Sequence, residues 1–352
     1  MSTNIVVPLP LDFESVTKLP NSHAWTLVTT DSDPAATPDT VPVVDLLCPN
    51  AASLVRHACE TCGYVQVTNH GVPSDLISQA ELQTGRLFSL PTQQKLRTVR
   101  SPNGLTGYGL ARISPFFSKR MWSEGFTIAA GSQAEHARQL WPHDDDDHDH
   151  RDSFCNVMEM YQRGMMRLAE KMAGLMLGSL GITAAHEDIK WVKPKNGCSN
   201  NPQGVLQLNS YPVCPDPTKA MGLAPHSDSS LLTILHQSNG IGGLQVKEEG
   251  IGWVPVHPVN GALVVFVGDL MHILSNGRFN NVLHRAVVNE THHRVSLAYF
   301  YGPPMDVKIS PLIDNHDHPP LYRPVTWQEY LDFKATHFNE ALELIKNDVK
   351  VM

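Results

Sequence analysis

The sequence predicts a mixed α/β protein of the α+β class, with a helix-rich front and a strand-rich back. Between residues 152 and 180, apolar residues recur at the i, i+3, i+4, i+7 spacing of one helical face. After Gly204, short apolar runs alternate with Gly, Pro and Asn, a pattern typical of a sandwich, a barrel or a jelly roll. Because 41% of the 352 residues are hydrophobic, the chain can build a substantial core.

The charge balance and the lack of long apolar runs exclude several classes of partner. Lys and Arg number 27 against 35 Asp and Glu, which gives a net charge of −8, so we expect no nucleic-acid partner. The first ten residues lack the basic segment of a secretory signal, and no apolar run approaches the ~20 residues that span a bilayer. We therefore expect a soluble cytoplasmic monomer with no membrane partner. Its six scattered cysteines are expected to be reduced thiols.

Changes in composition divide the chain into four expected regions. Prolines 34, 38 and 42 punctuate a polar entry segment, so residues 1–41 are expected to be extended or poorly ordered. Residues 42–200 form a helix-rich region and residues 201–310 a strand-rich core. Residues 311–352 form a C-terminal helical segment.

The front begins with an αβα pattern. The sequence predicts a helix over Ala51–Cys62 that ends at Gly63, and a strand over Tyr64–Thr68. The turn Asn69–Gly71 follows, and a second helix starts near Ser74. A long helix is predicted over residues 152–180.

Three conspicuous features of this front receive no function. Cys59 and Cys62 form a C-x-x-C, but no second pair completes a zinc site, so we interpret them as small buried residues rather than metal or redox ligands. The Met-rich stripe of the long helix is interpreted as core packing rather than a cofactor site. The acidic run Asp144–His150 could bind a cation weakly, but such dense like charges are typical of a solvated, flexible loop.

The strand-rich back is expected to contain seven short strands and a closing helical stretch. Turn residues separate the apolar runs at regular intervals, and no internal repeat of fixed period is visible. The expected strands are Val205–Tyr211, Leu231–His236, Gly243–Lys247, Trp253–His257, Ala262–Val267, Val282–Asn289 and Val295–Tyr301, and the helical stretch is Thr326–Lys346.

A candidate metal site lies in this part of the chain. His226 and Asp228 are two residues apart, so on extended backbone their side chains leave by the same face. His284, on another predicted strand, could complete a two-histidine, one-carboxylate set. Such a facial triad binds Fe(II) and leaves positions open for substrate and dioxygen. Because the chain has 18 histidines, the same pattern can also arise by chance.

A second pattern supports the metal site. Arg294 and Ser296 lie two residues apart on the next strand, where a guanidinium and a hydroxyl suit a carboxylate. The alternative for Arg294 is a surface ion pair. We expect the strands that carry His284 and Arg294 to form a hairpin. If the two side chains face one interior, paired residue numbers must sum to an even number, such as 288 with 294, so loop 290–292 has odd length or contains a bulge.

Two further polar residues are candidates for the same cavity. Asn209 and Tyr211 lie two residues apart on a predicted strand, so both side chains can enter the cavity and donate to an organic acid. The alternative is that Tyr211 packs in the core and Asn209 bonds backbone.

These residues together resemble those of a known family. The chain has Asn-x-Tyr-Pro-x-Cys-Pro at 209–215, His-x-Asp at 226–228, a distal histidine at 284 and Arg-x-Ser at 294–296. In this order and spacing they resemble the plant 2-oxoglutarate- and Fe(II)-dependent dioxygenases, from about Val41 to the C-terminal helix. Within that family the chain looks most like the gibberellin 3-oxidases. The stretches that carry this closer resemblance are Phe117–Thr127, Gly268–Gly277 and Gly302–Pro304.

The resemblance implies a fold, cofactors and a reaction. It implies a double-stranded β-helix, or jelly-roll core, that holds Fe(II) through His226, Asp228 and His284. It also implies that Arg294 and Ser296, with Tyr211 and Asn209, hold 2-oxoglutarate. Dioxygen is the oxidant and ascorbate the expected reductant. The implied reaction is hydroxylation of a gibberellin at C-3 on the β face to give the bioactive hormone, with succinate and carbon dioxide as co-products.

The chain departs from the family pattern at two positions. Ser227 stands where the family usually has Thr, and this position points away from the metal. Cys62 stands where an aromatic residue often precedes the glycine. We expect metal ligation to survive the change at Ser227, and the change at Cys62 to affect packing more than chemistry.

The substrate pocket is expected to combine apolar walls with a cation, because gibberellins are rigid, carboxylated diterpenoids. Each candidate is also compatible with a packing or surface role. The wall candidates are Tyr108, Phe116 and Trp122, and the carboxylate candidates are Arg112, Lys119 and Arg120.

Other functions share the same iron and co-substrate residues. A gibberellin 2-oxidase, a 20-oxidase or a flavonoid-pathway dioxygenase would differ only in the pocket. A hormone-binding protein on an inactive dioxygenase scaffold is the non-enzyme alternative, against which the complete residue set argues. The sequence does not indicate which gibberellin precursor is preferred, or whether 2-hydroxylation or desaturation accompanies the reaction.

Overall fold

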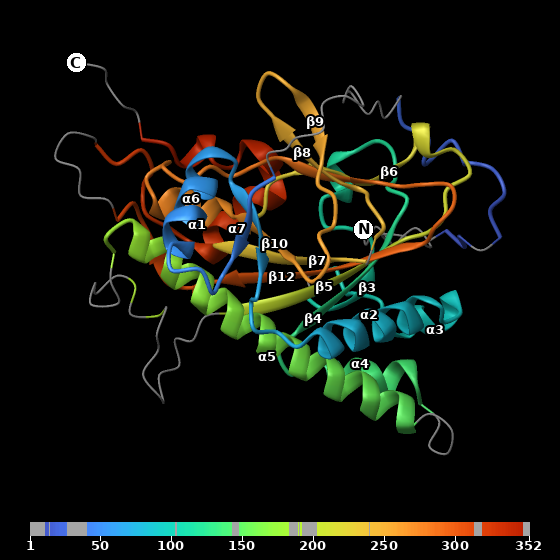
Figure 1. Cartoon of the computed structure of the whole chain (residues 1–352). Coiled ribbons are helices and arrows are strands. Elements are labelled where there is room, and N and C mark those ends of the chain that lie inside the picture. The colour runs from blue at the N-terminus through green and yellow to red at the C-terminus, as the bar shows by residue number, and fades with distance from the viewer. Residues whose placement is uncertain are drawn as a thin grey trace.

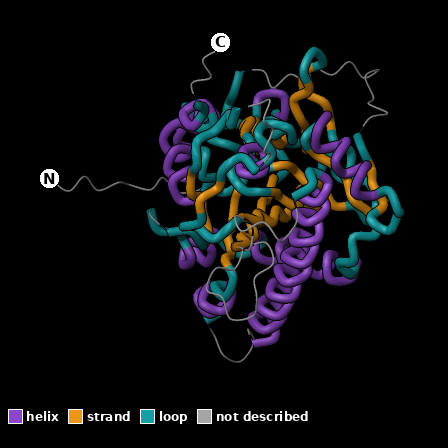
Figure 2. Tube along the Cα trace, turned by 90° about the vertical axis from the view of Figure 1, so that its left-hand side faces the viewer, coloured by secondary structure: helices purple, strands orange, loops and turns teal. Residues whose placement is uncertain are grey.

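Two facing β-sheets form the centre of the molecule, and most of the helices cover one side of them (Figures 1 and 2). The computed structural model describes residues 11–13, 15–26, 41–102, 104–142, 148–182, 189, 191, 203–238, 240–312 and 319–347.

The larger sheet has the strand order β1-β2-β10-β7-β12-β5-β4-β3, and the smaller one has the order β6-β11-β8-β9. From β5 to β12 the chain alternates between the two sheets, except that β8 and β9 form a hairpin within the smaller sheet, as in a double-stranded β-helix. The expected mixed α/β class with a jelly-roll core is therefore confirmed. The strands of the larger sheet are β1 Val43–Asp45, β2 Tyr64–Thr68, β3 Gly107–Gly109, β4 Glu124–Ala129, β5 Gln203–Tyr211, β7 Leu232–Gln237, β10 Leu263–Val267 and β12 Arg294–Gly302. Those of the smaller sheet are β6 Met221–His226, β8 Leu244–Glu248, β9 Gly252–Pro255 and β11 His284–Val287, and β13 Lys308–Ile309 pairs with β14 Val325–Thr326.

The helices occupy the front of the chain, one crossover and the C-terminal part. They are α1 Ala51–Thr61, α2 Ser74–Phe88, α3 Thr92–Lys95, α4 Gln133–Leu140, α5 His148–Ser179, α6 Asp269–Leu274 and α7 Trp327–His337. The helices predicted at 51–62, from Ser74 and at 152–180 are thus confirmed, with α5 starting four residues earlier. The closing helical stretch is shorter than predicted: α7 ends at His337, because Phe338 leaves the helical conformation with a φ of +51°.

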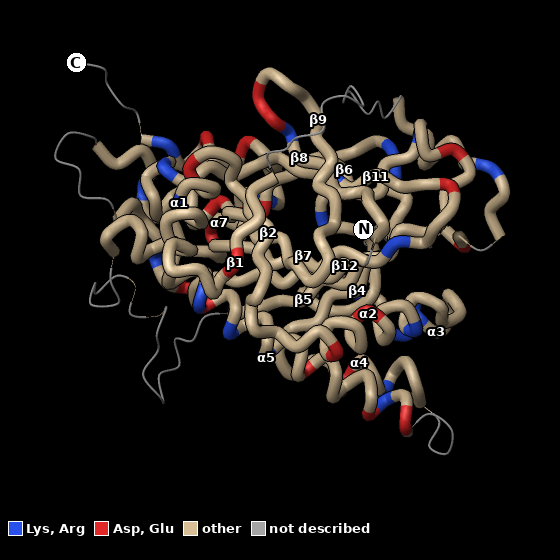
Figure 3. Tube along the Cα trace, viewed as in Figure 1, with Lys and Arg blue, Asp and Glu red and all other residues tan. Residues whose placement is uncertain are grey.

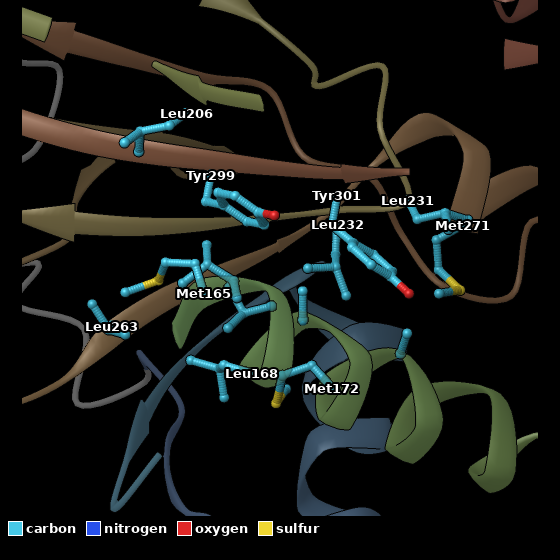
Figure 4. Packing of buried hydrophobic residues seen from close by; sticks show 14 of the residues in the cluster. Met165, Leu168, Met172, Leu206, Leu231, Leu232, Leu263, Met271, Tyr299 and Tyr301 are labelled. Atoms are coloured by element: carbon cyan, nitrogen blue, oxygen red, sulfur yellow. The ribbon is translucent and has the colours of Figure 1, made fainter. Parts of the chain in front are cut away.

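The long helix α5 packs against the larger sheet. It contacts β5, β7 and β12 on one side and α1, α2 and α4 on the other. Figure 4 shows Met165, Leu168 and Met172 of α5 facing Leu232 of β7 and Tyr299 of β12, all of them buried. The interpretation of the Met-rich stripe as core packing is confirmed, since this face lies in the main hydrophobic core.

The hairpin predicted between the strands of His284 and Arg294 is wrong. Strand β11 pairs with β6 and β8, whereas β12 pairs with β5 and β7 in the other sheet. Residues 288–293 therefore cross from one sheet to the other instead of closing a two-strand turn. The two side chains share an interior because two sheets face each other, so the even-sum rule does not apply.

Six strands have no counterpart in the sequence prediction: β1, β3, β4, β6, β13 and β14. Strand β6 contains Gly222 and Pro225, which are poor strand formers, and β3 has only three residues, two of them glycine. Strand β4 lies in a segment for which no strand was predicted, and it extends the larger sheet beyond β5.

The N-terminal segment is described in part. Residues 11–26, apart from 14, contain turns and pack against the core: Phe13 and His23 both meet the ring of Trp122 edge-on. Trp25 donates from Nε1 to the Arg120 carbonyl at 2.9 Å. Residues 1–10 and 27–40 lie outside the described residues, as do residues 144–147 of the acidic run.

The charged residues and the cysteines are scattered over the described part of the chain. Lys and Arg are interspersed with Asp and Glu over the described residues (Figure 3), and no described helix is long and apolar enough to cross a membrane. The five described cysteines are all free, and burial raises the pKa of the Cys59 thiol to about 12. Cys198 lies outside the described residues.

Candidate metal centre and co-substrate site

Three metal-ligating side chains meet at one end of the smaller sheet. His226 is the last residue of β6, Asp228 follows two residues later, and His284 is the first residue of β11. The two strands are antiparallel neighbours, and their register places His226 directly opposite His284. His226 and His284, which are 58 residues apart in the sequence, thus form a cross-strand pair.

The ligand atoms are close enough to share one ion. Asp228 Oδ1 lies 3.6 Å from His226 Nε2 and 3.8 Å from His284 Nε2, and the three ligand atoms all lie within 4.8 Å of one another. All three side chains are largely buried, and Asp228 Oδ2 has no hydrogen-bond partner among the described residues. A buried carboxylate oxygen without a partner is costly unless a cation satisfies it, so the donor set fits a divalent metal. This is the only such group of His, Cys, Asp and Glu within the described ranges.

Backbone carbonyls orient both imidazoles. His226 Nδ1 lies 2.9 Å from the Ala224 carbonyl, and His284 Nδ1 lies 3.3 Å from that of Val282. When each Nδ1–H donates to its carbonyl, the lone pair of Nε2 is directed at the shared point. The ring of Phe266 stacks on His284 with centroids 4.3 Å apart. Burial and the nearby His284 lower the pKa of His226 to about 4, so it is in the neutral, ligating form at neutral pH.

A buried ion pair supports the turn that carries Asp228. The Asp269 backbone N–H donates to the Asp228 carbonyl at 2.7 Å, and the side chain of Asp269 is completely buried. Its Oδ2 lies 2.9 Å from Lys334 Nζ and accepts from the Tyr330 hydroxyl at 2.7 Å. Lys334 Nζ also donates to Ser227 Oγ at 2.8 Å. The C-terminal helix α7 is thereby fixed to the turn between two metal ligands.

Sequence reasoning did not identify this ion pair. The available signal was a charged residue, Asp269, directly after the apolar strand β10, but nothing in the sequence pairs it with Lys334, 65 residues later. Ser227 points toward this cluster and not toward the metal ligands, as its hydrogen bonds show.

A second set of polar side chains lies on the larger sheet. Strand β12 pairs with β5 so that Arg294 is opposite Tyr211 and Ser296 is opposite Asn209. Arg294 and Ser296 are each only 2% exposed. Asn209 Nδ2 donates to Ser296 Oγ at 3.4 Å, and the guanidinium of Arg294 lies 5.1 Å from the centre of the Tyr211 ring. The structure therefore brings together all four residues that the resemblance assigns to the co-substrate.

This set lies next to the strands of the metal ligands. A Cβ on Gly222 of β6 would come within 2.9 Å of the Tyr211 ring, and Ala286 of β11 shares a buried cluster with Tyr211. A Cβ on Gly243, just before β8, would meet Arg294 Cδ at 3.1 Å. Tyr211 and Arg294 thus extend from the larger sheet to the smaller one.

The guanidinium of Arg294 fits a carboxylate ligand. Its Nε and Nη1 are buried and have no hydrogen-bond partner among the described residues. Either donor can form, with an N–H of the adjacent Nη2, the pair that binds a carboxylate through two parallel hydrogen bonds. Burial lowers the pKa of Arg294, but a guanidinium still carries its charge at neutral pH. A buried, charged and half-satisfied arginine is the observation that fits an organic acid such as 2-oxoglutarate.

Two of the expected substrate residues are placed in the core. Trp122 is fully buried, and its Nε1 donates to the Pro212 carbonyl at 3.1 Å. Tyr108 is 1% exposed, and its hydroxyl donates to Glu124, which also pairs with Lys95 Nζ at 2.6 Å.

The other four candidates lie nearer the surface. Phe116 is 36% exposed and stacks on Phe338, with centroids 4.8 Å apart. Arg112 Nη2 donates to the Gly104 carbonyl at 2.8 Å, and Lys119 Nζ donates to a carbonyl of the N-terminal segment at 2.8 Å. The Arg120 backbone N–H donates to that same segment at 2.8 Å.

Known proteins resemble this chain in both sequence and fold. The model of the 2OG-Fe(II) oxygenase superfamily matches residues 202–303, and that of the non-haem dioxygenase in morphine synthesis N-terminal region matches residues 41–144. A solved structure of JOX2 in complex with 2OG, Fe and JA superposes with a TM-score of 0.77 at 30% identity, covering 95% of each chain. A rice dioxygenase for auxin oxidation gives a TM-score of 0.69 at 26% identity, covering 88% of this chain and 100% of that one.

Fold and site together define an oxygenase that uses Fe(II) and 2-oxoglutarate. Gibberellin 3-beta-dioxygenase 3 of Arabidopsis thaliana is 51% identical over 96% of this chain and 95% of its own length. Gibberellin 3-beta-dioxygenase 1 of Pisum sativum is 50% identical over 95% of this chain and 89% of its own. The chain belongs to the 2OG-Fe(II) oxygenase superfamily and, within it, to the family of the gibberellin 3-beta-dioxygenases.

Proposed function

We propose that the protein hydroxylates a gibberellin at C-3 on the β face and forms succinate and carbon dioxide from 2-oxoglutarate. The observation that carries this proposal is the identity of about half of all residues with gibberellin 3-beta-dioxygenases, over 96% of the chain. The converged triad and the buried Arg294 support it, because an inactive binding protein would have no use for an intact metal site.

The triad holds the metal in this proposal. His226, Asp228 and His284 would hold the ion, and three protein ligands would leave coordination positions for the co-substrate and dioxygen. When bound, Fe(II) with 2-oxoglutarate supplies the activation of dioxygen that oxidises a C–H bond. The backbone carbonyls behind the two imidazoles keep the lone pairs on this point, so the ligands need no rearrangement as the metal enters.

The larger sheet orients the co-substrate. The unpaired N–H groups of Arg294 would bind the far carboxylate, and Ser296 and Tyr211 would donate hydroxyl hydrogen bonds to it. Asn209 holds Ser296 from the neighbouring strand. Because Arg294, Ser296 and Tyr211 are buried, the charge-assisted hydrogen bonds would be stronger than in solvent.

The substrate binds on the side of the segment that contains the six pocket candidates. We assign Trp122 and Tyr108 to the frame of the pocket, since both are buried with hydrogen-bonded polar atoms. Phe116 is proposed as an apolar wall, because its partner Phe338 precedes Asn339, which donates to the Pro225 carbonyl beside His226 at 3.4 Å. The carboxylate of the gibberellin is assigned to the cations of this segment, Arg112, Lys119 and Arg120.

Product analysis tests the proposed function. Purified protein is incubated with Fe(II), ascorbate as the proposed reductant, 2-oxoglutarate and a panel of 3-deoxy gibberellins, and the products are identified by mass spectrometry. We expect one added oxygen at C-3 and one succinate per product. His284→Ala abolishes both, whereas His292→Ala, an exposed histidine eight residues later, retains them. Oxidation at C-2 or C-20, a flavonoid product or no turnover would contradict the proposal.

The proposal also includes the state of the protein in the cell. We propose a cytoplasmic monomer whose residues 201–310 form the core that carries the site. Light scattering on the purified protein gives a mass of 38.9 kDa if the chain is monomeric. Twice that mass, or a tagged protein confined to an organelle, would contradict this part.

A further inference from the structure

A buried glutamine lies beside the arginine of the co-substrate site. Gln237 is the last residue of β7 and is 6% exposed. The register of β7 with β12 places it directly opposite Ser296, which in turn is opposite Asn209 of β5. Gln237, Ser296 and Asn209 therefore form one row across three strands, next to the row of Arg294 and Tyr211.

The amide of Gln237 is held at both ends. Its Oε1 accepts from Arg294 Nη2 at 3.1 Å, and its Nε2 donates to the Val256 carbonyl at 3.3 Å. Because the carbonyl of Val256 can only accept, the amide nitrogen must point to it and the amide oxygen to the guanidinium. The glutamine thereby satisfies one nitrogen of Arg294, and Nε and Nη1 stay without a partner.

We propose that Gln237 is a positioning residue for 2-oxoglutarate, an inference that rests on the proposed function. It fixes the plane of the guanidinium through one N–H of Nη2, so that the unpaired N–H groups are held in place for the carboxylate of the co-substrate. The Gln237 amide is also neutral, so it holds the guanidinium without adding a negative charge. A carboxylate at the same position would pair with Arg294 and compete with the incoming acid, whereas a neutral amide leaves the full positive charge available.

The chain contains a matched glutamine–arginine pair away from the site. Gln245 of β8 is directly opposite Arg285 of β11, and its Oε1 accepts from Arg285 Nε at 2.8 Å. Both residues are buried, and the guanidinium lies 4.2 Å from the Trp253 ring. Since successive side chains of a strand leave by opposite faces, Arg285 points away from the interior that its neighbour His284 enters.

The test compares Gln237→Glu with Gln245→Glu. Binding of 2-oxoglutarate to the Mn(II)-loaded proteins is measured by isothermal titration calorimetry, which needs no turnover. The thermal unfolding midpoint and the Mn(II) affinity are measured alongside. We expect Gln237→Glu to raise the dissociation constant of 2-oxoglutarate at least about tenfold with unchanged Mn(II) affinity, and Gln245→Glu to change it less than about twofold.

Each outcome decides the inference. If Gln237→Glu does not fold, Gln237→Met takes its place, since it removes the acceptor without adding charge and is expected to weaken 2-oxoglutarate about three- to tenfold. Unchanged 2-oxoglutarate affinity in the folded Gln237 variant, or an equal loss in Gln245→Glu, would overturn the inference. Failure of the wild-type protein to bind 2-oxoglutarate would instead overturn the proposed function.

Discussion

Removing the buried lysine behind the metal turn is expected to destabilise the protein and to weaken metal binding. Lys334 pairs with Asp269 at 2.9 Å, and their side chains are 12% and 0% exposed. In Lys334→Met, Asp269 keeps the hydrogen bonds from Tyr330 and Asn281 but loses the counter-charge of Lys334. Breaking a buried pair by removing one partner typically costs ~3–5 kcal/mol, and the remaining hydrogen bonds favour the lower end, about 3 kcal/mol.

For a chain of 352 residues, that loss corresponds to a fall of about 4 °C in the unfolding midpoint, measured by calorimetry. The metal affinity should fall as well, because Lys334 also holds Ser227 between two metal ligands. The control is Lys346→Met, whose pair with Glu343 has the same chemistry but exposed side chains, and which should move the midpoint by about 1 °C or less. Equal midpoints for the two variants would refute the assigned role of the buried pair.

Three further predictions concern the co-substrate, the pH dependence and a tight turn. Arg294→Lys should retain Mn(II) affinity but weaken 2-oxoglutarate at least about tenfold in calorimetry, because an ammonium cannot make two parallel hydrogen bonds; equal co-substrate affinity would contradict the two-donor assignment. Burial, with a smaller effect of Arg120, lowers the pKa of His23 to about 4, so the unfolded chain binds more protons than the folded one between that value and about 6.5. The stability contributed by a neutral His23 is thus present above pH 6.5 and is lost as the pH falls toward 4. Over this range the free energy of unfolding should decrease less for His23→Gln than for the wild-type protein. Identical pH profiles for the two proteins would exclude the effect. Gly63→Ala should lower the free energy of unfolding, measured in denaturant, by more than about 1 kcal/mol and by more than Gly131→Ala does. Both glycines have positive φ, but only at Gly63 would a Cβ meet a carbonyl oxygen, that of Asn280, at 2.3 Å. The reverse order would contradict the steric argument.

The motif residues could be predicted because their chemistry is local. His226 and Asp228 are two residues apart, and Arg294 and Ser296 repeat that spacing, so the geometry of extended backbone alone brings each pair to one face. Helix α5 could also be predicted from the sequence, because its apolar residues recur with helical periodicity over many turns. These features required no knowledge of which strands are neighbours.

The rest depended on the topology. The strands of His284 and Arg294 are consecutive along the chain, so a hairpin was predicted from the assumption that consecutive strands pair. In the structure these two strands belong to different sheets. Strand β6, which ends at His226, was not predicted because Gly222 and Pro225 are residues that rarely occur inside strands. The pair Asp269–Lys334 and the amide of Gln237 act through contacts between distant elements, for which a single sequence offers no signal.

Anaerobic titration of the protein with Fe(II) in the presence of 2-oxoglutarate tests the central claim most directly. We predict one Fe(II) per chain and the visible charge-transfer absorption that appears when 2-oxoglutarate chelates a bound ferrous ion. We also predict that this absorption is lost in Asp228→Ala. In Arg294→Leu, a much higher concentration of 2-oxoglutarate should be needed to produce it. An unchanged spectrum in both variants, or no absorption with the wild-type protein, would show that the iron and the acid do not meet where these two residues place them.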